Sequence, residues 1–441
     1  MDTNLIKKQT EKLIFLSKNK KFNEAIILCN ELINENVRNP LIYNIKGMIQ
    51  LNTGKYKDSL DQFNEAIKLS PNNFEIYNNI GISLYYLGKF NEAIKNYNKS
   101  LSIKLDYAEC YYNTGNAYVE LGEFDKAIIN FEKAIKYKPN YLDAQNNIIQ
   151  SLTFHNPKNE NENAFIKANN ELQDLKFHFD PNKKITQENI KLYFEKCFYI
   201  LKKNVDFFKF NFSQIYRRNK IDLNCGRHFA VFNTFNVIPE YCFGCYKVLI
   251  EPKKIIDLIK LYFVFDNINL NKSNLRKCMI EMRPNTPGIY KGFIYCTSLE
   301  DANSINSYIA PILKNTIDEK IKITVKRGCS EFAESIPEFK AVDDNSKFIM
   351  KYNDNWKNKE KIIDDKLHNI NNSNERVLAQ TMTGQTLNDI LIINNWLTYA
   401  KAINDNSCNN TITENSESEF IYNKISSHLN ERRKEFLNLN S

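Results

Sequence analysis

The sequence predicts an α+β protein of several domains, in which an N-terminal solenoid of helix pairs precedes an α/β sandwich with flanking helices. The first third of the chain repeats itself with a period of 34 residues, and a later stretch alternates strands with helices. A chain of 441 residues is long enough for two or three domains, each with its own core. The composition, 42% apolar and 25% charged, is typical of folded domains.

The repeat is visible as columns of matching residues between about residues 40 and 141. Small residues in these columns mark places where helices approach closely, and one glycine column marks the end of each unit's first helix, where positive φ is required. The columns are Tyr43, Tyr77 and Tyr111; Gly47, Gly81 and Gly115; Gly54, Gly88 and Gly122; Phe63, Tyr97 and Phe131; and Ala66, Ser100 and Ala134.

This pattern resembles the tetratricopeptide repeat over about residues 6–154, with a degenerate unit before the three full ones and one capping helix after them. The resemblance implies that the first helices line a concave groove in which a partner's peptide lies. Because the groove lacks Lys and Arg, it does not match relatives that hold a C-terminal carboxylate. An alternative is that its tyrosines pack between helices. The groove positions are Asn44, Met48, Asn78, Ile82, Tyr85, Tyr86, Tyr112 and Asn116.

The chain after the solenoid, which we place at residues 1–154, divides by composition and periodicity into four stretches. We expect a polar linker with one short helix, a helical lead-in that carries Cys and His, an α/β unit, and a polar, partly helical C-terminal region. These stretches are 155–185, 186–243, 244–330 and 331–441.

The α/β unit reads as strand, helix, strand, strand, helix, strand, which is the order of a ferredoxin-like sandwich. The strands are expected within 246–252, 276–284, 289–297 and 321–328, with helices after Pro252 and from Ser298.

The third of these strands reads Lys291, Gly292, Phe293, Ile294 and Tyr295, which partly resembles the RNA-recognition motif; Ile294 replaces a small residue of that pattern. The resemblance implies an open face of aromatic and basic side chains that stacks on bases. The alternative is that flanking segments cover this face and make the aromatic residues core. Alternation along the strands places these side chains on it: Lys247, Lys277, Arg283, Lys291, Phe293, Tyr295, Lys322 and Lys326.

Two close pairs of Cys and His residues have the spacing of a structural zinc site, Cys225 with His228 and Cys242 with Cys245. The alternatives are buried thiols that behave as small apolar side chains, or an iron–sulfur or redox role. Cys329, beside Arg327, is a candidate nucleophile because neighbouring cations lower a thiol pKa. No phosphate-binding glycine loop, HExxH or GxSxG motif occurs.

These observations favour a cytoplasmic adaptor that binds a protein segment in its groove and uses its second domain to bind a ligand or orient the partner. Nucleic-acid binding by the sheet is the first alternative; the net charge of +8 is weak support for it, because a general bias toward Lys, Asn and Ile supplies much of that charge. A repeat-fused transferase is the second. The N-terminal residues do not form a secretory signal and no apolar run is long enough for a membrane span, so we expect no membrane partner.

Overall fold

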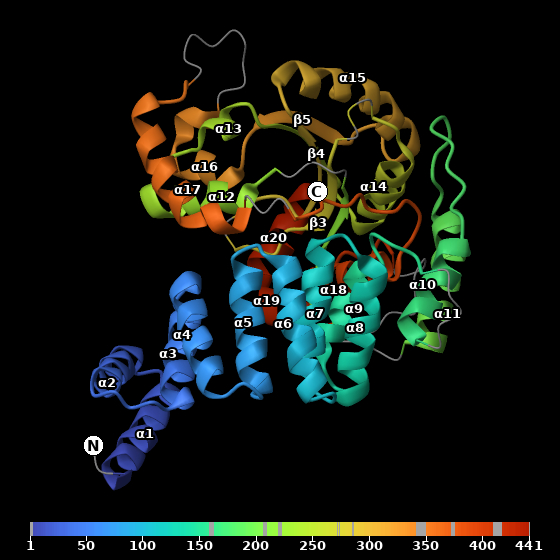
Figure 1. Ribbon diagram of the computed structural model, residues 1–441. Helices are drawn as coiled ribbons and strands as arrows, with labels where there is room; N and C mark the ends of the chain where they lie inside the picture. Colours follow the sequence, from blue (N-terminus) through green and yellow to red (C-terminus); the bar gives the residue numbers. More distant parts are fainter. Residues whose placement is uncertain are drawn as a thin grey trace. The chain divides into compact units, whose positions relative to one another are not determined.

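The computed structural model describes residues 3–157, 163–205, 210–218, 223–270, 272, 274–284, 286–340, 350–371, 375–408 and 417–440. The chain forms two compact units, Met1–Ser151 with Lys366–Val377 and Leu152–Asp365 with Leu378–Ser441 (Figure 1). Residues 158–162 of the stretch expected to be a linker lie outside the described residues. No helix in the described ranges combines the length and the apolar composition that a bilayer crossing needs.

The first unit is helical and contains the three predicted helix pairs, α3 with α4, α5 with α6, and α7 with α8. A further pair, α1 with α2, precedes them, and the single helix α9 follows at the position expected for a cap. The helices are α1 (Thr3–Lys18), α2 (Phe22–Asn34), α3 (Pro40–Asn52), α4 (Tyr56–Leu69), α5 (Phe74–Tyr86), α6 (Phe90–Ile103), α7 (Ala108–Glu120), α8 (Phe124–Tyr137) and α9 (Leu142–Ser151).

The glycine columns have the two physical roles that the sequence predicts. A methyl group at Gly47 would lie 2.6 Å from the Phe63 ring of the paired helix, and one at Gly81 would lie closer still to Tyr97. The rings of Phe63 and Tyr97 are buried, so these glycines allow the two helices of a unit to pack closely. The other column, for which Gly54 is representative with φ +77°, ends the first helix of each pair in the left-handed region.

The second unit holds a five-stranded antiparallel sheet with the strand order β1-β3-β4-β2-β5. Between residues 246 and 327 the elements follow in the expected order, and a further strand, β1, extends the sheet beside β3. The strands are β1 (Gln214–Arg217), β2 (Tyr246–Glu251), β3 (Arg276–Ile280), β4 (Tyr290–Cys296) and β5 (Lys322–Arg327).

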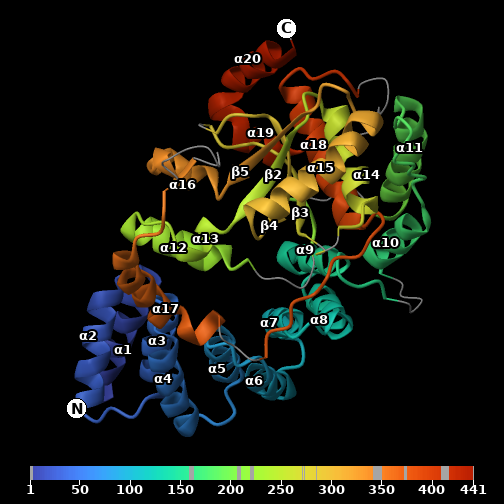
Figure 2. The same cartoon turned by 90° about the horizontal axis from the view of Figure 1, so that it is seen from above.

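Helices flank this sheet. In Figures 1 and 2, one group of them, α12, α13 and α16, lies together and away from α14. Phe232, Cys242, Phe332 and Phe339 form the core shared by this group with η1. The helices of this unit are α10 (Ala164–Asp174), α11 (Gln187–Asn204), α12 (Cys225–Phe235), α13 (Glu240–Phe243), α14 (Ile255–Asn267), α15 (Leu299–Thr316), α16 (Ser330–Ser335), η1 (Pro337–Lys340), η2 (Asp354–Trp356), α17 (Lys357–Asn371), which continues past the boundary of the unit, α18 (Leu387–Ala402), α19 (Glu419–Ile425), η3 (Ser426–His428) and α20 (Leu429–Asn440).

Segments expected to be peripheral contribute to the core of the second unit. Helix α10 comes from the stretch expected to be a linker. Its residue Asn169 accepts a hydrogen bond on Oδ1 from the Leu387 backbone N–H, at 2.9 Å. Helix α18, from the C-terminal region expected to be polar, is buried along almost its whole length, and Thr386 and Asp389 form a capping box at its start. A helix buried on every side belongs to a core and not to a surface.

Candidate functional site

The first helices of the repeats are joined side by side by a series of asparagine pairs. The first two pairs link equivalent turns of successive first helices, and the third lies one turn further along α7, so the pairs together fix the spacing of these helices. The amide group donates to the partner's Oδ1 in each pair: Asn79 to Asn44 at 3.1 Å, Asn113 to Asn78 at 3.0 Å, and Asn147 of α9 to Asn116 at 2.7 Å. Asn44 and Asn78 are buried, so these two predicted groove residues serve the packing of the array.

Apolar and aromatic side chains at the other predicted positions reach solvent. Met48 of α3 is 40% exposed and Tyr86 of α5 is 42% exposed, whereas Ile82 and Tyr112 are half-buried. The Tyr86 ring stacks on Tyr56 with a centroid separation of 4.8 Å, which fixes its orientation. Exposed apolar side chains also occur on second helices, such as Ile103 of α6, so Met48 and Tyr86 are distinguished by their place on neighbouring first helices joined by an asparagine pair.

Tyr85 contributes to a polar contact at the end of α7, because its hydroxyl donates to Glu120 Oε1 at 3.3 Å. Burial, followed by the Glu120 charge and hydrogen bond, raises the pKa of Tyr85, so the hydroxyl stays protonated at neutral pH. Tyr85 therefore holds Glu120 in place.

A segment from far along the chain contacts this same end of α7. The Val377 backbone N–H donates to the Glu120 carbonyl at 2.8 Å, and Arg376 Nε lies 2.8 Å from Glu120 Oε2. The backbone N–H of Asn91, at the start of α6, donates to Glu375 Oε2 at 2.9 Å. The repeat array thus already holds a short segment, Glu375–Val377, at the end of α7 and the start of α6.

The predicted basic and aromatic face of the sheet is largely enclosed. Phe293 is only 8% exposed, and Lys291 Nζ lies 3.0 Å from Glu281 Oε2. Arg283 pairs with Glu281 and with Glu331. At the edge of the sheet, Lys322 Nζ lies 2.6 Å from Glu251 Oε2. The remaining lysines of this face, Lys247, Lys277 and Lys326, differ because no carboxylate of the described residues forms an ion pair with them.

The four predicted zinc ligands occupy neighbouring elements. Cys225 begins α12, Cys242 lies in α13, and Cys245 precedes β2, whereas the buried His228 ring stacks on Tyr241. Burial and then Cys245, Cys329 and Cys225 raise the pKa of Cys242, so four thiols influence one another electrostatically. Over the described part of the chain, no three Cys, His, Asp or Glu side chains form a metal-binding group. Sequence reasoning did not place Cys329 in this neighbourhood.

The zinc site stays a prediction, and metal analysis of the anaerobically purified chain tests it. The zinc hypothesis predicts one zinc ion per chain, because a bound cation would stabilise the deprotonated thiols, whereas inert core cysteines would hold none. The Cys242→Ser variant is expected to lose the metal, and Cys408→Ser, at a buried thiol elsewhere, is the matched control. A purified chain that contains no metal would contradict the prediction.

The two candidate catalytic residues lie in different surroundings. The Arg327 guanidinium donates to the carbonyls of Phe243 and Met350 at 3.2 and 3.0 Å, and it stacks over the Phe243 ring. These contacts give Arg327 a packing role. Cys329 Sγ accepts a hydrogen bond from Lys247 Nζ at 3.2 Å and is half-buried.

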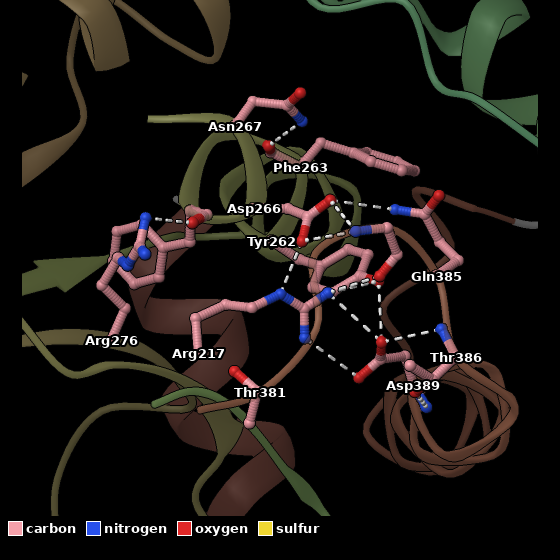
Figure 3. Close-up of polar contacts among 12 residues, drawn as sticks. Arg217, Tyr262, Phe263, Asp266, Asn267, Arg276, Thr381, Gln385, Thr386 and Asp389 are labelled. Carbon is pink, nitrogen blue, oxygen red and sulfur yellow. Dashed lines mark hydrogen bonds and ion pairs between the residues drawn. The ribbon is translucent and has the colours of Figure 1, made fainter. Parts of the chain in front are cut away.

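A buried ionic network that the sequence did not indicate surrounds Arg217, the last residue of β1 (Figure 3). Arg217 Nε lies 2.6 Å from Asp266 Oδ1 of α14, and its Nη2 lies 3.2 Å from Asp389 Oδ2 at the start of α18. Nη2 also donates to the Gly384 carbonyl at 3.0 Å. Burial opposes the charge, but Asp389, Tyr262 and Asp266 outweigh it and raise the pKa of Arg217. The network fastens the segment before α18 to the sheet and to α14.

Comparison with protein families identifies the repeats. A family model described as "Tetratricopeptide repeat" matches residues 73–140, and one described as "TPR repeat" matches residues 49–87. The search of curated proteins found no match.

Solved structures similar to this chain include the protein MamA, the protein YrrB and the first TPR of Spaghetti. MamA is 21% identical, with 45% of this chain and 95% of that chain covered and a TM-score of 0.32. YrrB, titled a TPR protein with an unusual peptide-binding site, is 17% identical, with coverages of 32% and 74% and a TM-score of 0.30. Spaghetti (RPAP3), bound to the HSP90 peptide SRMEEVD, is 23% identical, with coverages of 25% and 89% and a TM-score of 0.25.

Proposed function

We propose that this chain, whose residues 49–140 are tetratricopeptide repeats, is an adaptor that binds an extended segment of a partner protein across the first helices of those repeats. The observation that carries the proposal is the exposure of Met48 and Tyr86 on successive first helices whose spacing is fixed by asparagine pairs. A flexible thioether beside a fixed aromatic ring suits the apolar side chains of a bound peptide. Repeat arrays of this kind use such extended surfaces for recognition.

The segment Glu375–Val377 supports a more specific form of this proposal. It contacts Glu120 through one backbone hydrogen bond and one ion pair, which is how a sequence-selective peptide site combines main-chain and side-chain recognition. We therefore propose that a partner segment with a basic residue binds at Glu120 and competes there with the chain's own Arg376.

The second unit is proposed to be the ligand-binding or orienting part of the adaptor, with residues 244–330 forming a ferredoxin-like domain. The support is the strand order β3-β4-β2-β5, all antiparallel, with α14 and α15 connecting the strands in the order typical of that fold.

Peptides selected from a displayed random library against the full-length chain test the binding proposal. We expect the double change Met48→Glu and Tyr86→Ala to raise the Kd of selected peptides by about 30-fold, as measured by fluorescence anisotropy, because central apolar contacts carry most peptide affinity. The control is Ile103→Glu, which places the same charge at a similarly exposed position on α6, the second helix of its pair. Unchanged affinity in the double variant would show that these residues do not bind peptides.

A second variant tests the competition. Arg376→Glu removes an ion pair that is only partly buried, and such pairs contribute about 0.2–1 kcal/mol. Peptides with a basic residue should therefore bind this variant up to about five-fold more tightly than they bind the natural sequence. Weaker binding to the variant would contradict competition at Glu120.

A further inference from the structure

Three lysines project from one face of the sheet in the second unit. A methyl group placed at Gly292 would meet Leu261 of α14, so Gly292 faces that helix. Side chains alternate along a strand, so the next residue, Phe293, points to the opposite face. Lys277 is paired with Phe293, and Lys247 is paired with both Tyr295 and Lys326. Because paired residues of neighbouring strands point to the same side, all three lysines lie on the face turned away from α14.

The ammonium groups of these lysines gather around two adjacent rings. Lys277 Nζ lies 5.2 Å and Lys326 Nζ 5.4 Å from the centroid of the Phe293 ring, and Lys247 Nζ lies 4.9 Å from that of Tyr295. The two ring centroids are 6.5 Å apart. Three positive charges therefore share a small region that their side chains reach from three different strands.

No carboxylate of the described residues forms an ion pair with these three lysines, although Glu281 and Glu331 act on Lys277 and Lys326 from a greater distance. Burial opposes the charge of Lys247, but Tyr295, Cys329 and Cys245 outweigh it and raise the pKa of Lys247. Lys247 donates to Cys329 Sγ, Lys326 donates to Ser330 Oγ at 2.8 Å, and Lys277 lies over the rings of Tyr216 and Phe293. Glu281, which follows β3, and Glu331 of α16 already pair with Arg283, and Glu281 also pairs with Lys291.

Enclosure of these charges is costly without an anion. Lys247 is only 6% exposed, and Lys277 and Lys326 are half-buried. Burial and then repulsion by Lys247 lower the pKa of both Lys277 and Lys326 to about 8. Buried cations in proteins are normally paired with an anion, so an anion at this position would offset both effects.

The enclosure and the type of cation indicate the class of anion. Stacking of single-stranded nucleic acid needs open ring faces, whereas Phe293 is enclosed and has ammonium groups close to its ring. Three ammonium groups act as separate point charges, which suit a compact oxyanion with several oxygens. We propose that Lys247, Lys277 and Lys326 form a binding site for a small anion that carries a phosphate group.

The test is calorimetric titration of the full-length chain with inorganic phosphate, pyrophosphate and glycerol phosphate, each against chloride at equal ionic strength. We expect at least one of these probes to bind. The double change Lys277→Met and Lys326→Met should weaken that binding by about ten-fold or more for each lysine removed, because hydrogen bonds to charged groups are stronger than those between neutral groups. The control is Lys322→Met, on the same strand as Lys326 but exposed and paired with Glu251.

Two further readouts distinguish binding from a structural role. The double variant without ligand should melt at a higher temperature than the natural sequence, because it no longer encloses charges that repel one another. Binding should weaken as the pH rises through about 8, where the two lysines lose their protons.

The outcomes separate the sources of the phosphate group. Binding of pyrophosphate or phosphate alone would assign the site to a free oxyanion, and binding of glycerol phosphate would assign it to a phosphate ester; both support the proposal. The absence of binding by all three probes, or equal binding to the double variant, would overturn it. Lysine-dependent binding of a single-stranded oligonucleotide alone would also overturn it, in favour of nucleic-acid recognition.

Discussion

Replacing Gly81 with alanine is expected to lower the free energy of unfolding of the repeat array by about 1–3 kcal/mol, the usual cost of inserting a methyl group into a packed core. The new methyl group would overlap the buried Tyr97 ring, which could make room only by shifting against its own packed neighbours. The better helix propensity of alanine returns about 1 kcal/mol at most, so destabilisation wins. Urea unfolding followed by circular dichroism measures the difference.

The chain offers a matched control for this change. Gly226 also lies in a helix, α12, but a methyl group there would meet nothing within 4 Å. Gly226→Ala should therefore leave stability unchanged or raise it slightly. Equal effects of the two substitutions would contradict the close packing of helix pairs that we infer from the glycine column.

Replacing Arg217 with alanine is expected to cost about 3–5 kcal/mol, because the change leaves two buried carboxylates without their cation. Asp266 and Asp389 lie 2.6 and 3.2 Å from the guanidinium, and both are enclosed. Lys183→Ala is the control, since Lys183 is well exposed and its pair with Asp180 should contribute less than about 1 kcal/mol. Thermal unfolding of both variants compares these losses.

The pH dependence of this variant provides an internal check. Burial already raises the pKa of Asp266 in the folded chain despite the nearby Arg217. Without Arg217 the folded Asp266 carboxyl binds a proton more readily than the unfolded one, so the loss of stability should be smaller at about pH 5 than at about pH 8. A loss that is the same at both pH values would show that Arg217 acts through packing and not through its charge.

Local patterns were enough to predict the elements that depend on neighbouring residues. The repeat array follows from glycine and aromatic columns such as Gly81 with Tyr97, because each contact joins residues only 16 positions apart within one helix pair. The order of elements between residues 246 and 327 follows from alternation and from the cap at Ser298, which accepts the Asp301 N–H.

Contacts between distant parts of the chain left no pattern in the sequence from which they could be predicted. Arg217 and Asp389 are 172 residues apart, and neither lies in a pattern that points to the other. The short strand β1 joins the sheet only by pairing with β3. Asn44 and Asn78, which were predicted at the groove, are buried and accept hydrogen bonds from the next first helix. Their partners Asn79 and Asn113 also recur at 34 residues, and this second asparagine column was the signal that could have revealed the bridge.

The most direct test of the adaptor proposal is hydrogen exchange of the full-length chain with and without a peptide selected against it. We predict that the peptide slows exchange in the exposed turns of α3, α5 and α7, around Met48, Tyr86 and Glu120, while α4, α6 and α8 exchange as before. Slower exchange confined to the second helices of the pairs, or to the second unit, would contradict binding along the first helices.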